Sequence, residues 1–192
     1  TGLSANSGPA TTLYLGDGNG DFTEAGAGLT GVENSSSSVA DVNGDGNEDL
    51  LITGRDPVNI ATATLYLGDG SGSFAEAGAV LNEVSLGSTS IADVDGDGNE
   101  DLLITGYDGP DDTATLYLGD GTGGFTEAGA GLTGVRNGST SIADVYGDGK
   151  LDLIITGSSG GTPTATLYRN GDTAVPDAVK SLTATAAPDT VA

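Results

Sequence analysis

One pattern recurs along the chain with a period close to fifty residues, and it constrains the fold more than any other feature. The stretches ATTLYLGDGNGDFTEAGAGL, ATATLYLGDGSGSFAEAGAVL and TATLYLGDGTGGFTEAGAGL align readily. Tyr14, Tyr66, Tyr117 and Tyr168 mark the register, at spacings of 52, 51 and 51 residues. Such a period, rich in short strands and turns, is typical of β-propeller blades. A calcium-binding parallel β-helix, the competing repeat fold, has a far shorter repeat.

Each period divides into four strand-like pieces, shown by residues 88–94, 101–106, 113–119 and 125–132. Thr, Val, Ile, Leu, Tyr and Phe supply the β-preference, and Gly and Asp occupy the turns. The run DLLI is nearly continuous in apolar residues, which predicts a strand covered on both faces. No segment has a helical period, so the sequence predicts an all-β fold.

The repeats begin and end partway through a blade. We expect blades from segments 1–32, 33–84, 85–135 and 136–170. The predicted fold class is all-β, with β-propeller blades of four antiparallel strands in a partial propeller of about three and a quarter blades with open ends. The stretch TATLYRN at 164–170 reads as a third strand without a fourth, which the N-terminus of a full propeller or another chain would supply. Residues 171–192 are a linker or the start of a fibronectin type III-like domain, whose first strand they resemble.

The charge of the chain limits its partners. Five Lys and Arg residues stand against 28 Asp and Glu, for a formal net charge of −23. Nucleic acids and anionic membranes would be repelled. No apolar run approaches the roughly 20 residues of a membrane-spanning helix, so no membrane insertion is expected.

An acidic loop follows the first strand of each repeat, beginning at Asp41, Asp93 and Asp144. In the second copy, alternate residues of a glycine-containing turn can direct oxygens toward one centre. Side-chain oxygens would come from Asp93, Asp95, Asp97 and Asp101, and position 99 would offer its main-chain carbonyl. A hard cation such as calcium suits this supply. The alternative is a solvated acidic turn, which recurrence at a fixed phase disfavours.

The residues around the loop identify a family. Dockerins carry a similar acidic loop followed by a helix, but here the strand-like DLLITG follows. The stretches SVADVNGDGNEDLLITG and ATLYLGDGSGSF resemble the FG-GAP repeats of integrin alpha-subunit propellers and the related VCBS repeats of bacterial surface proteins. The resemblance covers residues 1–170 and implies calcium in the hairpin loop between the first two strands of a blade. It implies two ligand sets: Asp41, Asn43, Asp45, Asn47 and Asp49, and Asp93, Asp95, Asp97, Asn99 and Asp101.

The third loop departs from the family pattern. It offers Asp144, Asp148, the carbonyl of Lys150, and Asp152, but Tyr146 replaces a compact ligand at its third position. We expect weaker calcium binding here, or none, and we expect Tyr146→Asp to raise the affinity.

Two kinds of function follow from the resemblance, and both imply a secreted or cell-surface protein. One is an adhesion or recognition module that binds a protein or glycan through variable loops opposite the calcium hairpins. The other is a structural scaffold or spacer, with self-association through open blade edges as a further possibility. An enzyme is not expected, because the chain has no His to activate its Ser and Thr residues. Glu24, Glu76 and Glu127 recur in the stretch FTEAG or FAEAG and read as surface positions of outer strands.

Overall fold

The computed structural model describes residues 2–4, 8–171 and 180–183, and its regular elements are all β-strands. Within these residues no helix is long and apolar enough to span a membrane. In chain order the strands are β1 (Gly2–Ser4), β2 (Gly8–Ala10), β3 (Leu13–Gly16), β4 (Phe22–Ala25), β5 (Glu33–Ala40), β6 (Asp49–Arg55), β7 (Ala61–Gly68), β8 (Phe74–Glu76), β9 (Ser85–Ala92), β10 (Asp101–Tyr107), β11 (Asp112–Gly119), β12 (Phe125–Glu127), β13 (Arg136–Ala143), β14 (Asp152–Ser159), β15 (Thr162–Arg169) and β16 (Lys180–Thr183).

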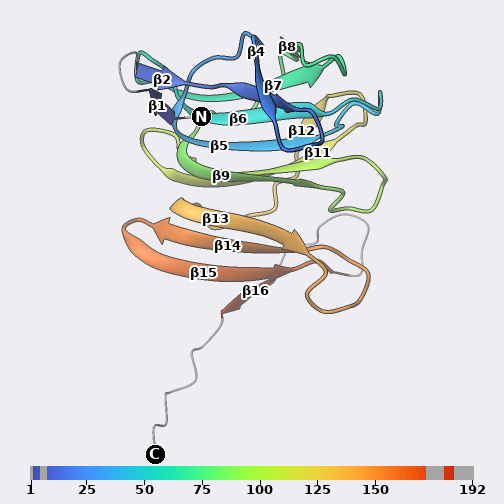
Figure 1. Ribbon diagram of the computed structural model, residues 1–192. Helices are drawn as coiled ribbons and strands as arrows, with labels where there is room; N and C mark the ends of the chain where they lie inside the picture. The colour runs from blue at the N-terminus through green and yellow to red at the C-terminus, as the bar shows by residue number, and fades with distance from the viewer. Residues whose placement is uncertain (1, 5–7, 172–179, 184–192) are drawn as a thin grey trace, which may run out of the picture.

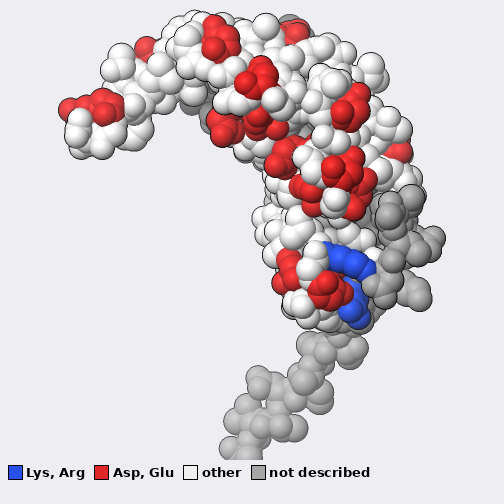
Figure 2. Space-filling model, turned by 90° about the vertical axis from the view of Figure 1, so that its right-hand side faces the viewer, with Lys and Arg blue, Asp and Glu red and all other residues white. Residues whose placement is uncertain are grey.

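Three sheets of four strands each form the body of the molecule (Figure 1). The strands of each sheet follow one another in sequence order as an antiparallel meander: β5 to β8, β9 to β12, and β13 to β16. The N-terminal strands form two hairpins, β1 with β2 and β3 with β4. The sheets lie side by side along an arc that does not close into a ring (Figure 2). The prediction of an all-β fold built from four-stranded antiparallel blades with open ends is confirmed.

The second strands β6 and β10 are buried on both faces, as their apolar runs predict, whereas Ile154 of β14 is only partly buried. In β6 the first six residues are buried, and the side chains of its three apolar residues alternate between two apolar clusters. Leu50 and Ile52 pack with Tyr66 on one face, and Leu51 packs with Leu102 of the next sheet on the other. Alternation is the natural pattern of a strand, and full burial of each Leu or Ile contributes roughly 1.5–3 kcal/mol. The apolar cores therefore lie between neighbouring blades.

Neighbouring blades also meet through hydroxyl groups on their first strands. The Thr89 Oγ1 lies 3.1 Å from the Ser36 Oγ and 2.7 Å from the Ser38 Oγ, and the Thr89 N–H donates to the Ser36 Oγ. The same arrangement recurs between the next two blades with Ser88, Ser90 and Thr140. The first strands of neighbouring blades touch without pairing their backbones. Ser and Thr hydroxyls bond to one another and accept backbone N–H groups there, which explains why these strands are rich in Ser and Thr.

The tyrosine that marks each repeat joins one blade to the preceding linker. The hydroxyls of the three buried copies accept a backbone N–H from 35 or 36 residues upstream: Thr30 to Tyr66 (3.2 Å), Asn82 to Tyr117 (2.8 Å) and Thr133 to Tyr168 (2.8 Å). Tyr14, in the N-terminal hairpin, is 56% exposed. The tyrosine is therefore part of the contact between blades and is buried where a blade precedes it.

The last sheet corrects one prediction. We expected no fourth strand after residues 164–170, but β16 pairs antiparallel with β15, with Leu167 opposite Leu182. The sequence KSLT does not match the FTEAG of the other fourth strands, which is why the repeat pattern misses it. The other residues of the segment 172–192, including most of the possible fibronectin type III-like start, lie outside the described residues, so that prediction stays untested.

Candidate metal-binding loops

The three acidic loops lie at one edge of the arc. They connect β5 to β6, β9 to β10 and β13 to β14, and all three project on the right-hand side of Figure 1. Seen from that side, Asp and Glu atoms gather along the arc, while Lys and Arg atoms appear at one end only (Figure 2). The hairpins from the second to the third strands lie at the opposite edge.

The first aspartate of each loop holds the turn by accepting N–H groups from its two glycines. The Asp93 carboxylate accepts the Gly96 N–H at 2.8 Å and the Gly98 N–H at 3.0 Å. Gly96 and Gly98 have φ values of 80° and 91°, a conformation that favours glycine over any residue with a Cβ. In the first loop these donors, that of Gly46 foremost, hold the pKa of the Asp41 carboxyl below its usual range. These N–H donors and the two glycine conformations therefore account for the sharp backbone path of the loop.

The last aspartate of the loop opens the second strand and is buried. The Asp101 carboxylate accepts the N–H groups of Val94 at 2.7 Å and Asp95 at 3.3 Å on one oxygen, and that of Gly119 at 2.9 Å on the other. Burial raises the pKa of this carboxyl, although the backbone donors oppose the shift. The side chain thus ties the acidic loop to the last residue of β11.

The same tie is present in the other two blades. One oxygen of Asp49 accepts the Val42 N–H and the other accepts the Gly68 N–H. Asp152 does the same with the N–H groups of Val145 and Asn170. Asp49 and Asp152 are both 0% exposed. A buried, hydrogen-bonded carboxylate at the start of the second strand is therefore a constant feature of the blade.

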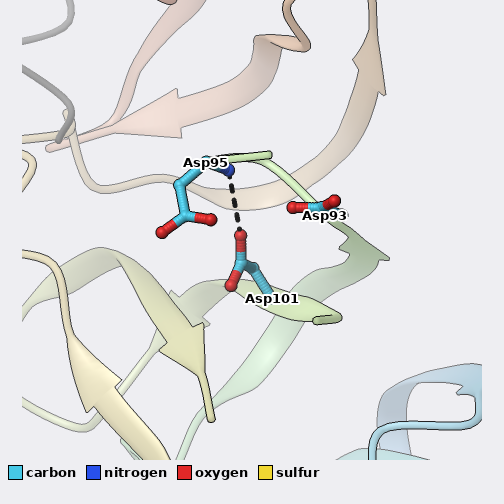
Figure 3. A group of neighbouring side chains, drawn as sticks. All are labelled: Asp93, Asp95 and Asp101. Atoms are coloured by element: carbon cyan, nitrogen blue, oxygen red, sulfur yellow. Dashed lines mark hydrogen bonds between the residues drawn. The ribbon is translucent and has the colours of Figure 1, made fainter. Parts of the chain in front are cut away.

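Three predicted ligands of the second loop come together. Asp93, Asp95 and Asp101 each offer a carboxylate oxygen within 4.8 Å of those of the other two, and among the described residues they alone form such an acidic group. In Figure 3 the carboxylates of Asp93 and Asp95 lie on either side of that of Asp101, and the dashed line marks the bond from the Asp95 N–H to the Asp101 carboxylate. Three carboxylates at this spacing are a suitable set for a hard cation.

The two remaining predicted ligands of this loop lie at its tip, outside the acidic group. Asp97 is exposed, and its carboxylate accepts the N–H of Asn99 at 2.8 Å and the side-chain amide of Asn99 at 2.9 Å. The Asn99 side chain lies against Gly121 of the turn after β11, where a Cβ would meet it. The Asn99 side chain therefore packs the loop against the turn after β11. This is compatible with its predicted role, because Asn99 would bind the ion through its main-chain carbonyl.

The first loop has the same backbone with one carboxylate fewer. Asp41 accepts the N–H groups of Gly44 and Gly46 at 2.8 Å each, matching Asp93. Asn43 replaces the second acid, and its amide oxygen accepts the Asp45 N–H at 2.9 Å while its NH₂ donates to the Asp45 carboxylate. The remaining predicted ligand, Asn47, lies against Gly70 as Asn99 lies against Gly121. Amide oxygens also bind calcium, so the donor set of this loop fits the ion.

The third loop does not fit a divalent cation in the same way. Asp144 and Asp152 keep their backbone partners, but Asp148 is paired with the Arg169 guanidinium at 2.9 Å. This contact holds the pKa of the Asp148 carboxyl below its usual range. Tyr146 offers no compact oxygen at the position of Asp95, and Lys150 places a positive charge in the loop.

Carboxylates of neighbouring loops repel one another. Burial raises the pKa of the Glu100 carboxyl, and the charges of Asp93, Asp41 and Glu48 raise it further. Asp41 and Glu48 belong to the preceding blade, so the first two loops are near neighbours in space as well as similar in sequence. A cation at either loop would relieve this repulsion.

The geometry defines a class: a non-closed array of β-propeller-like blades, each with an acidic hairpin loop between its first two strands. The family model of the FG-GAP-like repeat matches residues 41–104 and 93–155, which together span more than half of the chain. The chain belongs to the FG-GAP repeat family. Repeats of this family are generally non-enzymatic structural or binding modules. A search among curated proteins found no match.

Two features of the site were missed by reasoning from the sequence. One is the hydrogen bond from the buried aspartate to the backbone at the end of the third strand. Residue types do not reveal it, because the N–H donor lies 18 or 19 residues away in the sequence. The other is Arg169. Aligning LYLG, LYLG and LYRN would have shown Arg169 at the position of Leu67 and Leu118.

Proposed function

We propose that this chain is a calcium-stabilised β-propeller-like binding module of a larger secreted or cell-surface protein. The observation that carries the calcium proposal is the grouping of Asp93, Asp95 and Asp101 at the edge of the second full blade. Two of the three side chains face solvent in part, and the third is buried. Each of the first two loops carries five Asp or Asn residues at alternate positions, in a protein of formal charge −23.

The residues of the chain prepare the loop and would hold the ion. Asp93 fixes the turn through the two glycine N–H groups, and Asp101 anchors its end to the core. Both keep lone pairs free, because a carboxylate has about four acceptor positions. A bound calcium ion would supply positive charge where the loop has only carboxylates, and so would stabilise the hairpin that joins two core strands.

Thermal unfolding in calcium and in chelator tests this proposal. Saturation of a site at about 100 times its Kd adds about 2.7 kcal/mol to the free energy of unfolding, so chelation should lower the Tm by several degrees. The matched control is Asp93→Asn/Asp95→Asn, which should lose part of the calcium-dependent shift. An unchanged Tm on chelation in the wild-type chain would refute the proposal.

The recognition of a protein or glycan is assigned to the opposite edge. The hairpins there differ in sequence from blade to blade: residues 56–60, 108–111 and 160–161. Val58 is 71% exposed and Ile60 57% exposed, although both are large apolar side chains on a short turn. On a neighbouring part of this edge, Arg136 stacks over Tyr107 at 4.7 Å and pairs with Asp112 at 3.2 Å. Aromatic and Arg side chains beside exposed apolar groups are common at interfaces.

A glycan array and a pull-down from secreted proteins, both with the full chain, test the recognition proposal. Val58→Ser/Ile60→Ser is the matched variant, because it removes apolar surface without touching the core. We expect a ligand whose binding this variant weakens by tenfold or more. Binding that is unchanged by the variant, or no binding in either assay, would favour the scaffold or spacer function.

Self-association is the second candidate, and the exposed N-terminal hairpin favours it. Tyr14, Leu15 and Phe22 are 56%, 45% and 70% exposed, whereas the equivalent tyrosines are buried between blades. Sedimentation at increasing concentration tests it, with Phe22→Ser as the variant. A monomer at every concentration would exclude this function.

A further inference from the structure

The third acidic loop differs from the other two through a residue outside the loop. Arg169 is the last residue but one of the LYRN segment, where the other blades have Leu67 and Leu118. Leu67 packs against the apolar core between two blades. Arg169 instead crosses to the acidic loop of its own blade, 21 residues back along the chain.

The guanidinium of Arg169 makes two contacts with the loop. Its Nη2 donates to Asp148 Oδ2 at 2.9 Å, and the group lies over the Tyr146 ring at 4.5 Å from the centroid. Tyr146 and Asp148 stand at the positions of Asp95 and Asp97 in the second loop. A guanidinium stays charged at every relevant pH, and it binds both carboxylates and aromatic faces. In the third loop, Tyr146 thus replaces an acidic residue, and Arg169 stacks over its ring.

We propose that Arg169 is a built-in cation of the third loop, which replaces the calcium ion of the other two. This inference rests on the proposed calcium binding at loops 41–49 and 93–101. The second loop has five carboxylates and no basic side chain, whereas the third has three carboxylates, with Lys150 in the loop and Arg169 beside it. Little negative charge is left for a divalent cation to neutralise.

The rest of the third loop keeps the blade architecture without the ion. Asp144 still accepts the N–H groups of Gly147 at 2.7 Å and Gly149 at 2.9 Å, and Asp152 still joins the loop to residue 170. The Asn170 side chain adds a bond of its own to the Val94 carbonyl of the preceding blade, at 2.8 Å. The array would then contain two loops that respond to calcium and one that stays braced when calcium is removed.

Calorimetric titration of the full chain with calcium tests the inference. The expected result for the wild-type chain is a calcium stoichiometry that Asp144→Asn leaves unchanged and that Asp93→Asn lowers by one ion per chain. The double variant Tyr146→Asp/Arg169→Leu places at these two positions the residue types that the second blade has, and it should bind one ion more than the wild type. Tyr146→Asp alone should gain less, because Arg169 still pairs with Asp148.

Thermal unfolding of Arg169→Leu gives a second readout that does not depend on counting ions. Both Arg169 and Asp148 are partly exposed, with side-chain exposures of 53% and 29%, so the variant is expected to fold. It should lose the same few degrees of Tm in calcium as in chelator. For the double variant, calcium should restore the loss.

The outcomes separate the two proposals. A wild-type stoichiometry that Asp144→Asn lowers would overturn the built-in cation, as would a double variant that gains no ion. A stoichiometry that Asp93→Asn leaves unchanged would overturn calcium binding at the second loop instead, whatever the third loop does.

Discussion

The base and the tip of each acidic loop carry the same residue type and have different roles. At the base, Asp101 is 1% exposed and accepts three backbone N–H groups. At the tip, Asp97 is exposed and its bonds are to its near neighbour Asn99. The base is tied to the fold by these bonds and also belongs to the group of three carboxylates, whereas the tip is organised only locally. One aspartate-rich motif therefore combines a structural tie with a set of ion ligands.

The last sheet, β13 to β16, supports this distinction between the base and the tip of the loop. Its base residue, Asp152, is kept with both of its backbone partners, while its tip has exchanged an acid for Tyr146 and gained Arg169. The tip can change because another positive group takes part in neutralising it. The base cannot change without leaving buried N–H groups unpaired.

The largest expected effect is that of removing the base carboxylate. Asp101→Ala leaves the buried N–H groups of Val94 and Gly119 without acceptors, and each such group costs about 1–3 kcal/mol. We expect the free energy of unfolding to fall by about 2–4 kcal/mol, measured by urea denaturation. Most of this loss should remain in chelator, and the loss should be larger in calcium, because the variant also removes one of the three grouped carboxylates. A loss seen only in calcium would show that Asp101 acts as a ligand and not as a tie.

Two glycine substitutions, one near the base of the loop and one at its tip, should have smaller effects on stability. A Cβ on Gly119 would overlap the Glu100 carbonyl and lie 3.3 Å from the Phe125 ring, so Gly119→Ala forces the two turns apart at a cost of about 1–3 kcal/mol. Gly98→Ala meets no atom within 4 Å, and its cost comes from φ of 91° alone, about 1 kcal/mol.

Urea denaturation of both glycine variants in chelator checks this order. Equal losses would mean that the contact between the loop base and the neighbouring turn contributes little to stability. A larger loss for Gly98→Ala would reverse the comparison, because the tip would then be the more constrained part of the loop.

Much of the fold follows from the period of the sequence. The fifty-residue repeat predicts the four-stranded blades, and the apolar run after each acidic loop predicts strands buried on both faces, as in β6 and β10. The strand β16 could not be predicted, because its sequence is not that of the repeat and only its pairing with β15 identifies it. Local pattern specifies a strand, but the choice of partner depends on which edge is available.

For the site, the sequence locates the loop and its five candidate ligands, but it does not show that only three of them gather or what each one contacts. Asp93, Asp95 and Asp101 come together as their alternate spacing suggests. The three aspartates have different roles because they differ in burial, and the sequence of the loop does not show how deeply each one is buried. The same holds for Arg169, whose role is set by its position at the end of β15, over the Tyr146 ring of the acidic loop. Whether the loops bind calcium stays a prediction.

The smallest expected effect is also the most discriminating, because its sign depends on calcium. Asp97→Asn removes one negative charge from a loop with no basic side chain, so in chelator it should relieve repulsion and raise the Tm by about 1 °C. In calcium the same change removes a predicted ligand and should lower the Tm. Glu76→Gln, at an exposed position of β8, removes one charge away from the loop and should shift the Tm in the same direction in both solutions. If Asp97→Asn raised the Tm in calcium as well, Asp97 would not be a ligand, and the site would reduce to the three carboxylates of Figure 3.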